Sequence, residues 1–375
     1  MSRVMNGAVK GRLLLAAVAL LFVGGFTSTA VAQAPARMKS THVILVITDG
    51  FRWQELFGGA DESLMGRAGR VADTAAMRKA FWRDTPQARR SALLPFLWST
   101  IATKGQVFGD STAGSPAAVT NGLKFSYPGY SEAFTGHPDK RIDSNDHGPN
   151  ENRTVFEFLN AQPAYKGSVA AFATWNAFRR IINTGRSGVP VYDGWDNAIA
   201  PTGTARASSL KAMLDINTRL WPDNTWDAFT HLSTLDYMAV HKPKVLFIGY
   251  GETDEWAHSG RYDMYLQSAH QVDAYLKDLW DRAQANPVTR DQTTLIVTTD
   301  HGRGLGPKWT DHGESVDGAE RWWAAVIGPD VAPLGVRRNT PATQSQIAAT
   351  IAAALGFDWP KAEPLAAKPL PVFNR

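Results

Sequence analysis

Short runs of apolar residues recur along the chain, and polar residues follow each of them. The clearest runs are His42–Thr48 (HVILVIT), Lys244–Gly251 (KVLFIGYG) and Thr293–Thr299 (TTLIVTT), and Val169–Thr174 and Trp322–Ile327 have a similar form. The runs are apolar almost throughout rather than alternating, and β-branched residues are common in them, which is the pattern of strands buried on both faces. They predict a parallel sheet.

Helical patterns lie between the apolar runs. They cover Thr154–Ala161, Ser208–Leu220, Tyr262–Ala285 and Ala342–Leu355. Strands that alternate with helices predict an α/β fold, with a doubly wound, mainly parallel sheet flanked by helices. The stretch 58–109 is the least regular, because charged residues mix there with Trp, Phe and Pro. We interpret it as a small cap or surface insertion that covers the functional site.

The N-terminal segment has a different character. Arg3, Lys10 and Arg12 precede the apolar run Leu13–Phe26, and small residues follow as far as Ala32. This order is typical of a secretory signal peptide cleaved after Ala32, and the run is shorter than the ~20 apolar residues that cross a membrane. We therefore expect a secreted or periplasmic protein with no stable membrane span once the signal peptide is removed.

Composition limits the classes of function. The 375 residues include no cysteine, which excludes disulfides and thiolate metal ligands. The net charge of +4 includes three basic residues of the signal segment, so the rest carries +1 and indicates no nucleic-acid partner. We divide the chain into the signal peptide 1–32, an Ala- and Pro-containing linker 33–40 and a single domain 41–375.

Carboxylates and imidazoles follow the three clearest runs. Ligands of a parallel α/β sheet bind beyond the carboxyl ends of its strands, so these side chains are expected to converge. Taken singly, each has an ordinary interpretation as a capping acid, a turn residue or a surface histidine. Together they have the oxygen and imidazole character that Zn²⁺ or Mn²⁺ prefers. The predicted ligands are Asp49, Asp254, His258, Asp300, His301 and His312.

The order of these motifs resembles the alkaline phosphatase superfamily, particularly its nucleotide pyrophosphatase/phosphodiesterase and cofactor-independent phosphoglycerate mutase branches. The matching segments are ITDGFRWQELF (47–57), FSYPGYSEAFTG (125–136), GETDEWAHSGRYD (251–263), TTDHGRG (298–304) and DHGE (311–314). The resemblance implies one alkaline phosphatase-like catalytic domain over 41–375 that holds two divalent metal ions. It assigns one ion to Asp254, His258 and His312, and the other to Asp49, Asp300, His301 and the nucleophile.

The family places its nucleophile immediately before an aromatic-Pro pair, and this register selects Ser126. Pro128 suits a first helical turn, so Ser126 is expected at a helix N-terminus, where free N–H groups favour a phosphate. Two alternatives remain: Ser126 is only an N-cap, or Ser131 is the nucleophile. The family has Asn after the aromatic-Pro pair, whereas this chain has Gly129.

The resemblance also implies a phosphate-binding asparagine a fixed interval after a His-Gly pair. His147 and Gly148 place it at Asn152, and Asn150 competes for the role. Either residue also suits an Asx turn, because the surrounding loop is rich in Asn, Asp and Gly.

The resulting hypothesis is an exported hydrolase that cleaves a small-molecule phosphate ester through a phosphoserine. A phosphomonoesterase is favoured, and a phosphodiesterase or nucleotide pyrophosphatase is the alternative. A dianionic monoester calls for a cation beyond the metals, whereas a diester needs room for a second organic group. The available side chains are Lys124, Arg179 and Arg180 as cations and Trp175 and Phe178 as an apolar wall.

Other functions are less consistent with the sequence. A sulfatase of this fold modifies Cys or Ser in C/S-x-P-x-R, but the segment Ser126–Tyr130 lacks the arginine. A mutase normally works in the cytoplasm, and the signal peptide argues against it. A non-catalytic phosphate- or glycan-binding protein is the remaining alternative, and the retention of a complete ligand set with a hydroxyl nucleophile argues against it.

Overall fold

The computed structural model describes residues 38–373. The predicted signal peptide and most of the predicted linker therefore lie outside the described residues. No helix within 38–373 has both the length and the apolar character that crossing a membrane requires.

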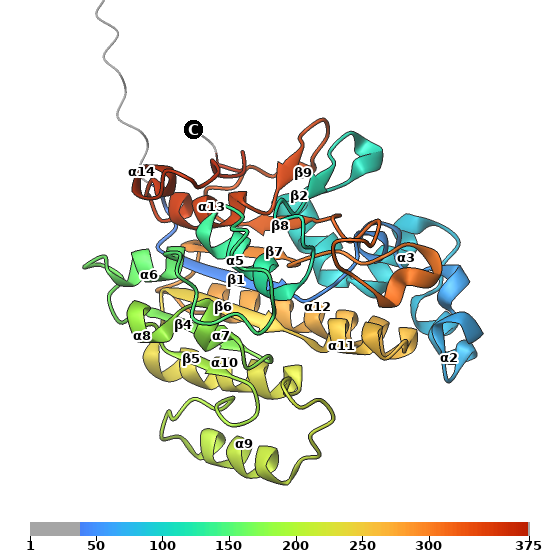
Figure 1. The fold of residues 1–375 in the computed structure, drawn as a ribbon, viewed down its shortest axis with the longest axis horizontal. Helices are drawn as coiled ribbons and strands as arrows, with labels where there is room; N and C mark the ends of the chain where they lie inside the picture. Colours follow the sequence, from blue (N-terminus) through green and yellow to red (C-terminus); the bar gives the residue numbers. More distant parts are fainter. Residues whose placement is uncertain (1–37, 374–375) are drawn as a thin grey trace, which may run out of the picture. The chain divides into compact units, whose positions relative to one another are not determined.

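A large central sheet organises the described part of the chain (Figure 1). Its eight strands lie in the order β5-β4-β6-β1-β7-β8-β2-β9. Only β8 runs antiparallel to its neighbours among these strands, which confirms the predicted mainly parallel sheet. The strands are β1 (His42–Thr48), β2 (Gln106–Phe108), β4 (Val169–Ala173), β5 (Val191–Asp193), β6 (Val245–Tyr250), β7 (Thr293–Thr298), β8 (Ala324–Ile327) and β9 (Gly335–Val336). A separate parallel pair joins β3 (Ala117–Ala118) to β10 (Ala342–Thr343).

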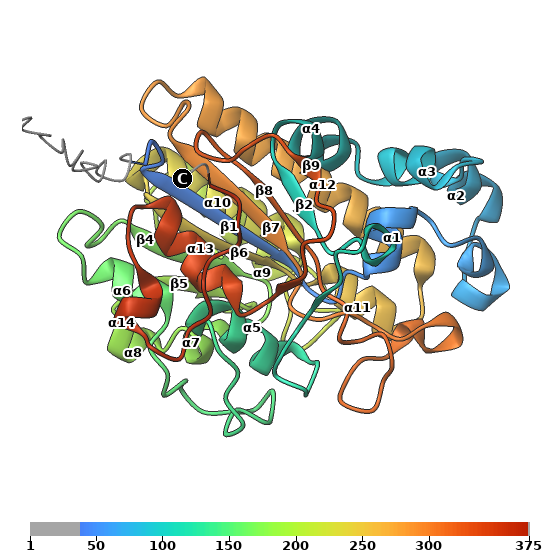
Figure 2. The same cartoon turned by 90° about the horizontal axis from the view of Figure 1, so that it is seen from above.

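Helices cover both faces of the sheet, as Figures 1 and 2 show. The helices are α1 (Trp53–Gly58), α2 (Thr74–Phe81), α3 (Pro86–Leu93), α4 (Ala102–Lys104), α5 (Ser126–Thr135), α6 (Val155–Asn160), α7 (Phe178–Ile181), α8 (Thr184–Ser187), α9 (Ala205–Ile216), α10 (Asp227–His241), α11 (Glu252–His258), α12 (Tyr262–Ala285), α13 (Gln346–Ala354) and α14 (Trp359–Ala362). Helices α5, α6 and α13 pack on one face, and α10 and α12 pack on the other.

The central strand β1 shows why the apolar runs lack alternation. Val43, Leu45 and Ile47 belong to the hydrophobic core beneath α5 and α13, whereas Ile44 and Val46 belong to the core beneath α12. Successive side chains of a strand point to opposite faces, so a sheet covered on both faces needs apolar residues at every position.

Helix α9 covers Ala205–Ile216 rather than the predicted Ser208–Leu220, and two further expectations differ from the structure. Residues 342–343 pair with β3 as a short strand, so the predicted helix begins only at Gln346. The stretch 58–109 supplies β2 to the main sheet and buries Leu93, Leu97 and Ile101 in the core. The end of the stretch is therefore part of the sheet and of its packing, whereas α2 and α3 before it are largely exposed at the surface. A strand of three residues is too short for periodicity to reveal it.

Candidate metal centre

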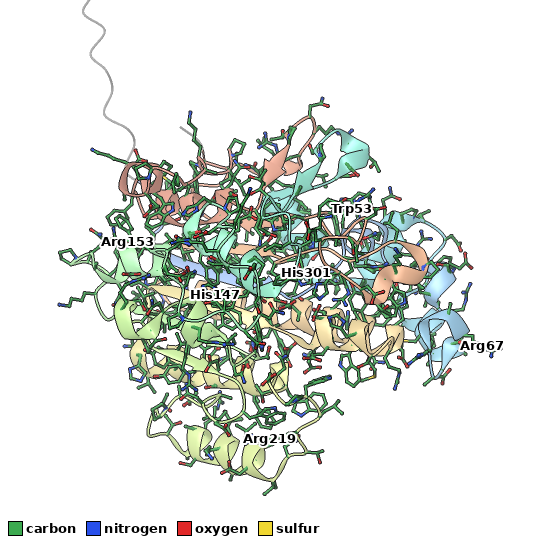
Figure 3. All side chains as sticks on the ribbon, viewed as in Figure 1. Trp53, Arg67, His147, Arg153, Arg219 and His301 are labelled. Atoms are coloured by element: carbon green, nitrogen blue, oxygen red, sulfur yellow. The ribbon has the colours of Figure 1, made fainter. Side chains whose placement is uncertain are left out.

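The predicted ligands converge because their strands are neighbours. Strands β6, β1 and β7 lie side by side and parallel, so their carboxyl ends meet at one edge of the sheet. Asp49 follows β1, α11 carries Asp254 and His258 just after β6, and Asp300 follows β7. His301 comes next and lies fully buried, near the middle of the view in Figure 3.

Three of these side chains and the hydroxyl of Ser126 form what we call the first centre, which consists of Asp49, Asp300, His301 and Ser126. Nε2 of His301 lies 3.4 Å from Oδ1 of Asp49, 3.4 Å from Oδ2 of Asp300 and 3.4 Å from Oγ of Ser126. Nδ1 of His301 lies 2.9 Å from the carbonyl oxygen of Gly302 and is the protonated nitrogen in this arrangement, which leaves the lone pair of Nε2 for a metal. Ligand atoms about 2.1 Å from a tetrahedral ion lie about 3.4 Å apart, so this separation fits one ion.

Each of the two carboxylates of the first centre has one oxygen without a hydrogen bond from the described residues. Oδ1 of Asp49 and Oδ2 of Asp300 are buried and receive no hydrogen bond from residues 38–373. Burial raises the pKa of both groups well above the usual range, and the charge of Asp254 raises the pKa of Asp49 further, as that of Asp49 does for Asp300. Unpaired buried charges are costly, and a divalent cation would remove this cost.

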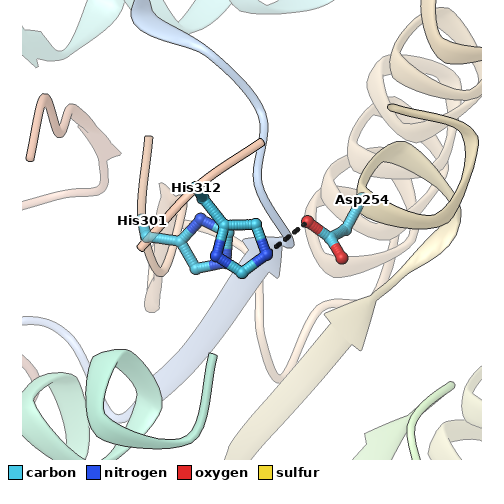
Figure 4. Close-up of side chains that lie close together, drawn as sticks. All are labelled: Asp254, His301 and His312. Carbon is cyan, nitrogen blue, oxygen red and sulfur yellow. Dashed lines mark ion pairs between the residues drawn. The ribbon is translucent and has the colours of Figure 1, made fainter. Parts of the chain in front are cut away.

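The second centre consists of Asp254, His258 and His312. Nε2 of His258 lies 3.2 Å from Oδ2 of Asp254 and 2.9 Å from Nε2 of His312. Oδ1 of Asp254 lies 3.8 Å from Nε2 of His312 (Figure 4). Burial, and next the neighbouring His301, lower the pKa of His312 to about 2, so its imidazole is neutral and able to bind a metal.

His301 also lies close to the ligands of the second centre. Its ligand atom lies within 4.8 Å of those of Asp254 and His312, and its ring stacks on that of His312 with 4.0 Å between centroids (Figure 4). The sequence assigned His301 to the first centre alone. The two centres therefore adjoin one another through this imidazole.

A buried arginine distinguishes the second centre from the first. Arg303 is fully buried and forms an ion pair with Asp254, while its Nε donates to the carbonyl oxygen of Trp309. Although burial raises the pKa of Asp254, Arg303 and His258 outweigh this effect, and the pKa lies well below its usual range. Sequence reasoning gave Arg303 no role, although it lies within the TTDHGRG segment.

Helix α5 presents the predicted nucleophile to the first centre. Ser126 is its first residue and lies buried at the N-terminus, where the helix dipole and free N–H groups favour an anion. The rival Ser131 is also buried, but its Oγ accepts a hydrogen bond of 3.0 Å from Nδ2 of Asn150. The geometry thus brings Ser126, and not Ser131, to the first centre.

The departure from the family pattern at Gly129 has a steric reason. A Cβ at this position would lie 2.6 Å from the carbonyl oxygen of Asp300. Helix α5 therefore packs directly on the segment that carries Asp300 and His301, and any larger residue would push Ser126 away from the first centre.

A cavity of about 690 Å³ opens beside Ser126. Its wall combines ligands of both centres with polar and aromatic side chains from the loops after β4, before α6 and after α9. The lining residues are Asp49, Ser126, Asn145, Asp146, Trp175, Asn176, Arg179, Arg180, Asp196, Pro222, Asp223, Asn224, Gly251, Asp254, Glu255 and His258. None of them comes from the stretch 58–109.

Asn152 does not line this cavity. Its Nδ2 donates to Asp139 over 2.7 Å and its Oδ1 accepts from Arg141, so its amide is used within the loop. Asn150 is buried against Ser131. Asn145 lines the cavity instead and accepts a hydrogen bond of 2.9 Å from the backbone N–H of Tyr127, next to the nucleophile. Spacing could not single out Asn145, because the loop holds several asparagines.

The three candidate cations differ in whether they line the cavity and in their partners. Arg180 lines the cavity, and its Nη2 donates to the carbonyl oxygen of Asn145 over 3.3 Å. Arg179 lines it as well but forms an ion pair of 2.7 Å with Asp193. Nζ of Lys124 donates to the carbonyl oxygen of Glu314 outside the lining.

The expected apolar wall is only partly present. Trp175 lines the cavity. Phe178 instead lies fully within the core, packed edge-on against Tyr130 with 4.6 Å between ring centroids. The expectation that Phe178 contacts substrate is therefore wrong: α7 turns its ring inward, toward the sheet.

Removal of metal is expected to destabilise the protein as well as to inactivate it. Free metal at 1,000 times the dissociation constant adds about 4 kcal/mol per site to the free energy of unfolding. Treatment with a chelator should therefore lower the melting temperature by about 5 °C or more, and Zn²⁺ or Mn²⁺ should restore it. Because no arginine pairs with the two carboxylates of the first centre among the described residues, whereas Asp254 of the second centre pairs with Arg303, the metal should leave in two steps.

The pH dependence of melting provides a check. In the metal-free protein the raised pKa values of Asp49 and Asp300 mean that both carboxyls favour folding only while protonated. This contribution is lost as pH rises above about 4, the usual pKa of a carboxyl group. The difference in melting temperature between the metal-loaded and the chelated protein should therefore widen toward neutral pH. Melting curves that chelation leaves unchanged across this range would contradict both centres.

A family model matches part of the chain. Residues 224–358 match the family described as Metalloenzyme superfamily, and this segment contains five of the six predicted ligands, all except Asp49. No curated protein matches the sequence.

Solved structures share the fold at low sequence identity. Wild-type alkaline phosphatase PafA has a TM-score of 0.57 and 11% identity, over 91% of this chain and 100% of its own. The phosphonate monoester hydrolase SpPMH from Silicibacter pomeroyi has a TM-score of 0.53 and 15% identity, over 88% and 76%. BT1596, a 2-O GAG sulfatase, has a TM-score of 0.52 and 10% identity, over 89% and 76%. Residues 224–358 thus match the model of the Metalloenzyme superfamily, and the chain as a whole has a fold similar to that of an alkaline phosphatase.

Proposed function

We propose that this protein is an exported, two-metal phosphoric ester hydrolase with Ser126 as its nucleophile. The observation that carries the proposal is the first centre, where two unpaired buried carboxylate oxygens and the hydroxyl of Ser126 surround one imidazole nitrogen. Export rests on the N-terminal sequence pattern, and a mature chain that begins at Gln33 is its measurable sign.

Each side chain has a definite part in this reaction. The hydroxyl oxygen of Ser126 attacks phosphorus, the bond from phosphorus to the leaving oxygen breaks, and water then hydrolyses the phosphoserine. Two divalent ions, when bound, would lower the pKa of the attacking hydroxyl and stabilise the charge on the phosphoryl oxygens. The N-terminus of α5 orients the phosphoryl group, and Asn145 and Arg180 are placed to bind its outer oxygens.

A phosphomonoester is the favoured substrate. A dianionic group benefits from one cation beyond the metals, and the guanidinium of Arg180 lies beside Asn145 on the cavity wall. The fold shared with an alkaline phosphatase and a phosphonate monoester hydrolase is consistent with this choice.

A phosphodiester is the second candidate. The cavity of about 690 Å³ exceeds the volume of a phosphate group, and Trp175 and Pro222 on its wall could accommodate a second organic group. A sulfate ester is less favoured, because Ser126-Tyr127-Pro128-Gly129-Tyr130 lacks the arginine of the sulfatase sequence.

Hydrolysis of three chromogenic esters by the zinc- or manganese-loaded protein tests the proposal. We expect kcat/KM to decrease from the 4-nitrophenyl phosphate monoester to the bis-ester and then to the sulfate. Arg180→Met should lower kcat/KM for the monoester about 10–100-fold more than for the bis-ester, because only the monoester carries a second charge. Arg179→Met, next to it but paired with Asp193, is the matched control.

The same assay separates the alternatives. Faster hydrolysis of the bis-ester would favour the phosphodiesterase, and faster hydrolysis of the sulfate would replace the proposal by a sulfatase. Metal-loaded protein that binds phosphate but hydrolyses none of the three esters would identify a non-catalytic binding protein.

A further inference from the structure

The carboxylate of Asp49 has a buried hydrogen-bond donor that no sequence motif indicated. The hydroxyl of Tyr130 donates to Oδ2 of Asp49 over 3.0 Å, and both side chains are buried. The other oxygen, Oδ1, is the one that lies 3.4 Å from Nε2 of His301 and receives no hydrogen bond from the described residues. One oxygen of this carboxylate is therefore held by the protein, and the other is left for the first centre.

Tyr130 and the nucleophile lie on the same face of one helix. Tyr130 follows Ser126 by four residues in α5, and residues four apart are neighbours on a helix surface. Helix α5 thus brings both the hydroxyl of the nucleophile and the hydroxyl that orients Asp49 to the end of β1. A shift of this helix would disturb the nucleophile and the ligand together.

The ring of Tyr130 is held in place independently of its hydroxyl. It packs edge-on against Phe178 with 4.6 Å between centroids, and against Phe134 and Phe247 at 5.9 and 6.2 Å. This aromatic packing would remain with phenylalanine at position 130, because the ring is unchanged. The hydroxyl can therefore be removed without removing the packing.

We propose that Tyr130 is a positioning residue of the first centre, which orients the carboxylate of Asp49 so that Oδ1 faces the metal. The proposal rests on the proposed function, since it assumes that the first centre binds a metal. Hydrogen bonds to the far side of a metal ligand keep it in the binding orientation, and their loss typically weakens metal binding 10–100-fold.

Zinc titration of the metal-free protein in competition with a chromophoric chelator tests this role in Tyr130→Phe. We expect one of two zinc sites to weaken about 10–100-fold and the other to keep its wild-type affinity. At limiting zinc kcat should fall with little change in KM, and excess zinc should restore it. Cobalt(II) in place of zinc should show an altered visible spectrum, because the ligand geometry at that site changes.

Tyr127→Phe is the matched control, because Tyr127 lies on the same helix and its hydroxyl donates to the carbonyl oxygen of Gly148 over 2.7 Å, away from both centres. It should leave both zinc affinities unchanged. Wild-type affinities at both sites in Tyr130→Phe would overturn the proposal, and so would equal weakening at both sites or in both variants. Wild-type protein that binds no zinc would instead defeat the proposed function, so the two failures are distinguishable.

Discussion

Replacement of Ser126 by alanine should lower kcat by about 10⁴-fold or more while metal and phosphate binding persist. In the proposed reaction the hydroxyl forms the covalent intermediate, whereas Asp49, Asp300 and His301 keep the other three positions around the first centre. The N-terminus of α5 also remains available to an anion. Single-turnover kinetics and phosphate binding by calorimetry measure the two effects separately.

The covalent intermediate provides a second measurement on the wild-type protein. The substrate for this experiment is a phosphate ester with a labelled phosphoryl group, and the reaction is quenched with acid during turnover. The label should remain on the peptide that contains Ser126, because low pH protonates the metal ligands and stops hydrolysis of the phosphoserine. Ser131→Ala is the control. It removes the acceptor of Asn150 Nδ2 and should lower the free energy of unfolding by about 1–3 kcal/mol while kcat of the folded protein stays the same.

Two outcomes would reject Ser126 as the nucleophile. Normal turnover by Ser126→Ala would mean that the residue is only the first residue of a helix. A label on Ser131 would mean that the alignment with the family pattern is shifted by five residues, in spite of the geometry.

Replacement of His301 by alanine should have the second largest effect, with kcat/KM reduced by about 10³-fold or more. Its Nε2 lies 3.4 Å from both carboxylates of the first centre, and its ring stacks on His312 of the second. Elemental analysis should therefore show that the metal of the first centre is lost and that the content of metal at the second centre is reduced. The remaining carboxylates, Asp49 and Asp300, would then be buried without a ligand partner, so this variant should also melt earlier.

His258→Ala is the contrasting variant, because within residues 38–373 the polar contacts of this imidazole are with Asp254 and His312, and its side chain is 46% exposed. This variant should lose the metal of the second centre and keep that of the first. Its melting temperature should equal that of wild-type protein loaded with one metal. Equal metal loss in the two variants would mean that the centres do not bind independently, and full metal content in His301→Ala would remove His301 from the ligand set.

Much of the fold could be read from local sequence. The strand β1 and the helix α12 have the predicted bounds, because uninterrupted apolar runs and a long amphipathic period are signals carried by neighbouring residues. Strands β2, β3 and β10 were not recognised, since each has two or three residues and exists only through its pairing with a distant segment. Residues 342–343 are apolar and precede a helix, and only contact with Ala117–Ala118 makes them a strand.

For the candidate site, too, some features follow from the sequence and others only from the tertiary structure. The sequence alone determined which residue types could bind metal and where they follow strands, because Asp49, Asp254 and Asp300 occupy positions that any parallel sheet would bring together. Only the tertiary structure decided how they are arranged: His301 adjoins both centres, Arg303 forms an ion pair with Asp254, and the hydroxyl of Tyr130 donates to Asp49. It also placed Asn145 rather than Asn152 on the cavity wall. These roles depend on side-chain directions and on contacts between distant segments, as between Gly50 and Asp300, which are 250 residues apart, and no local pattern encodes such contacts.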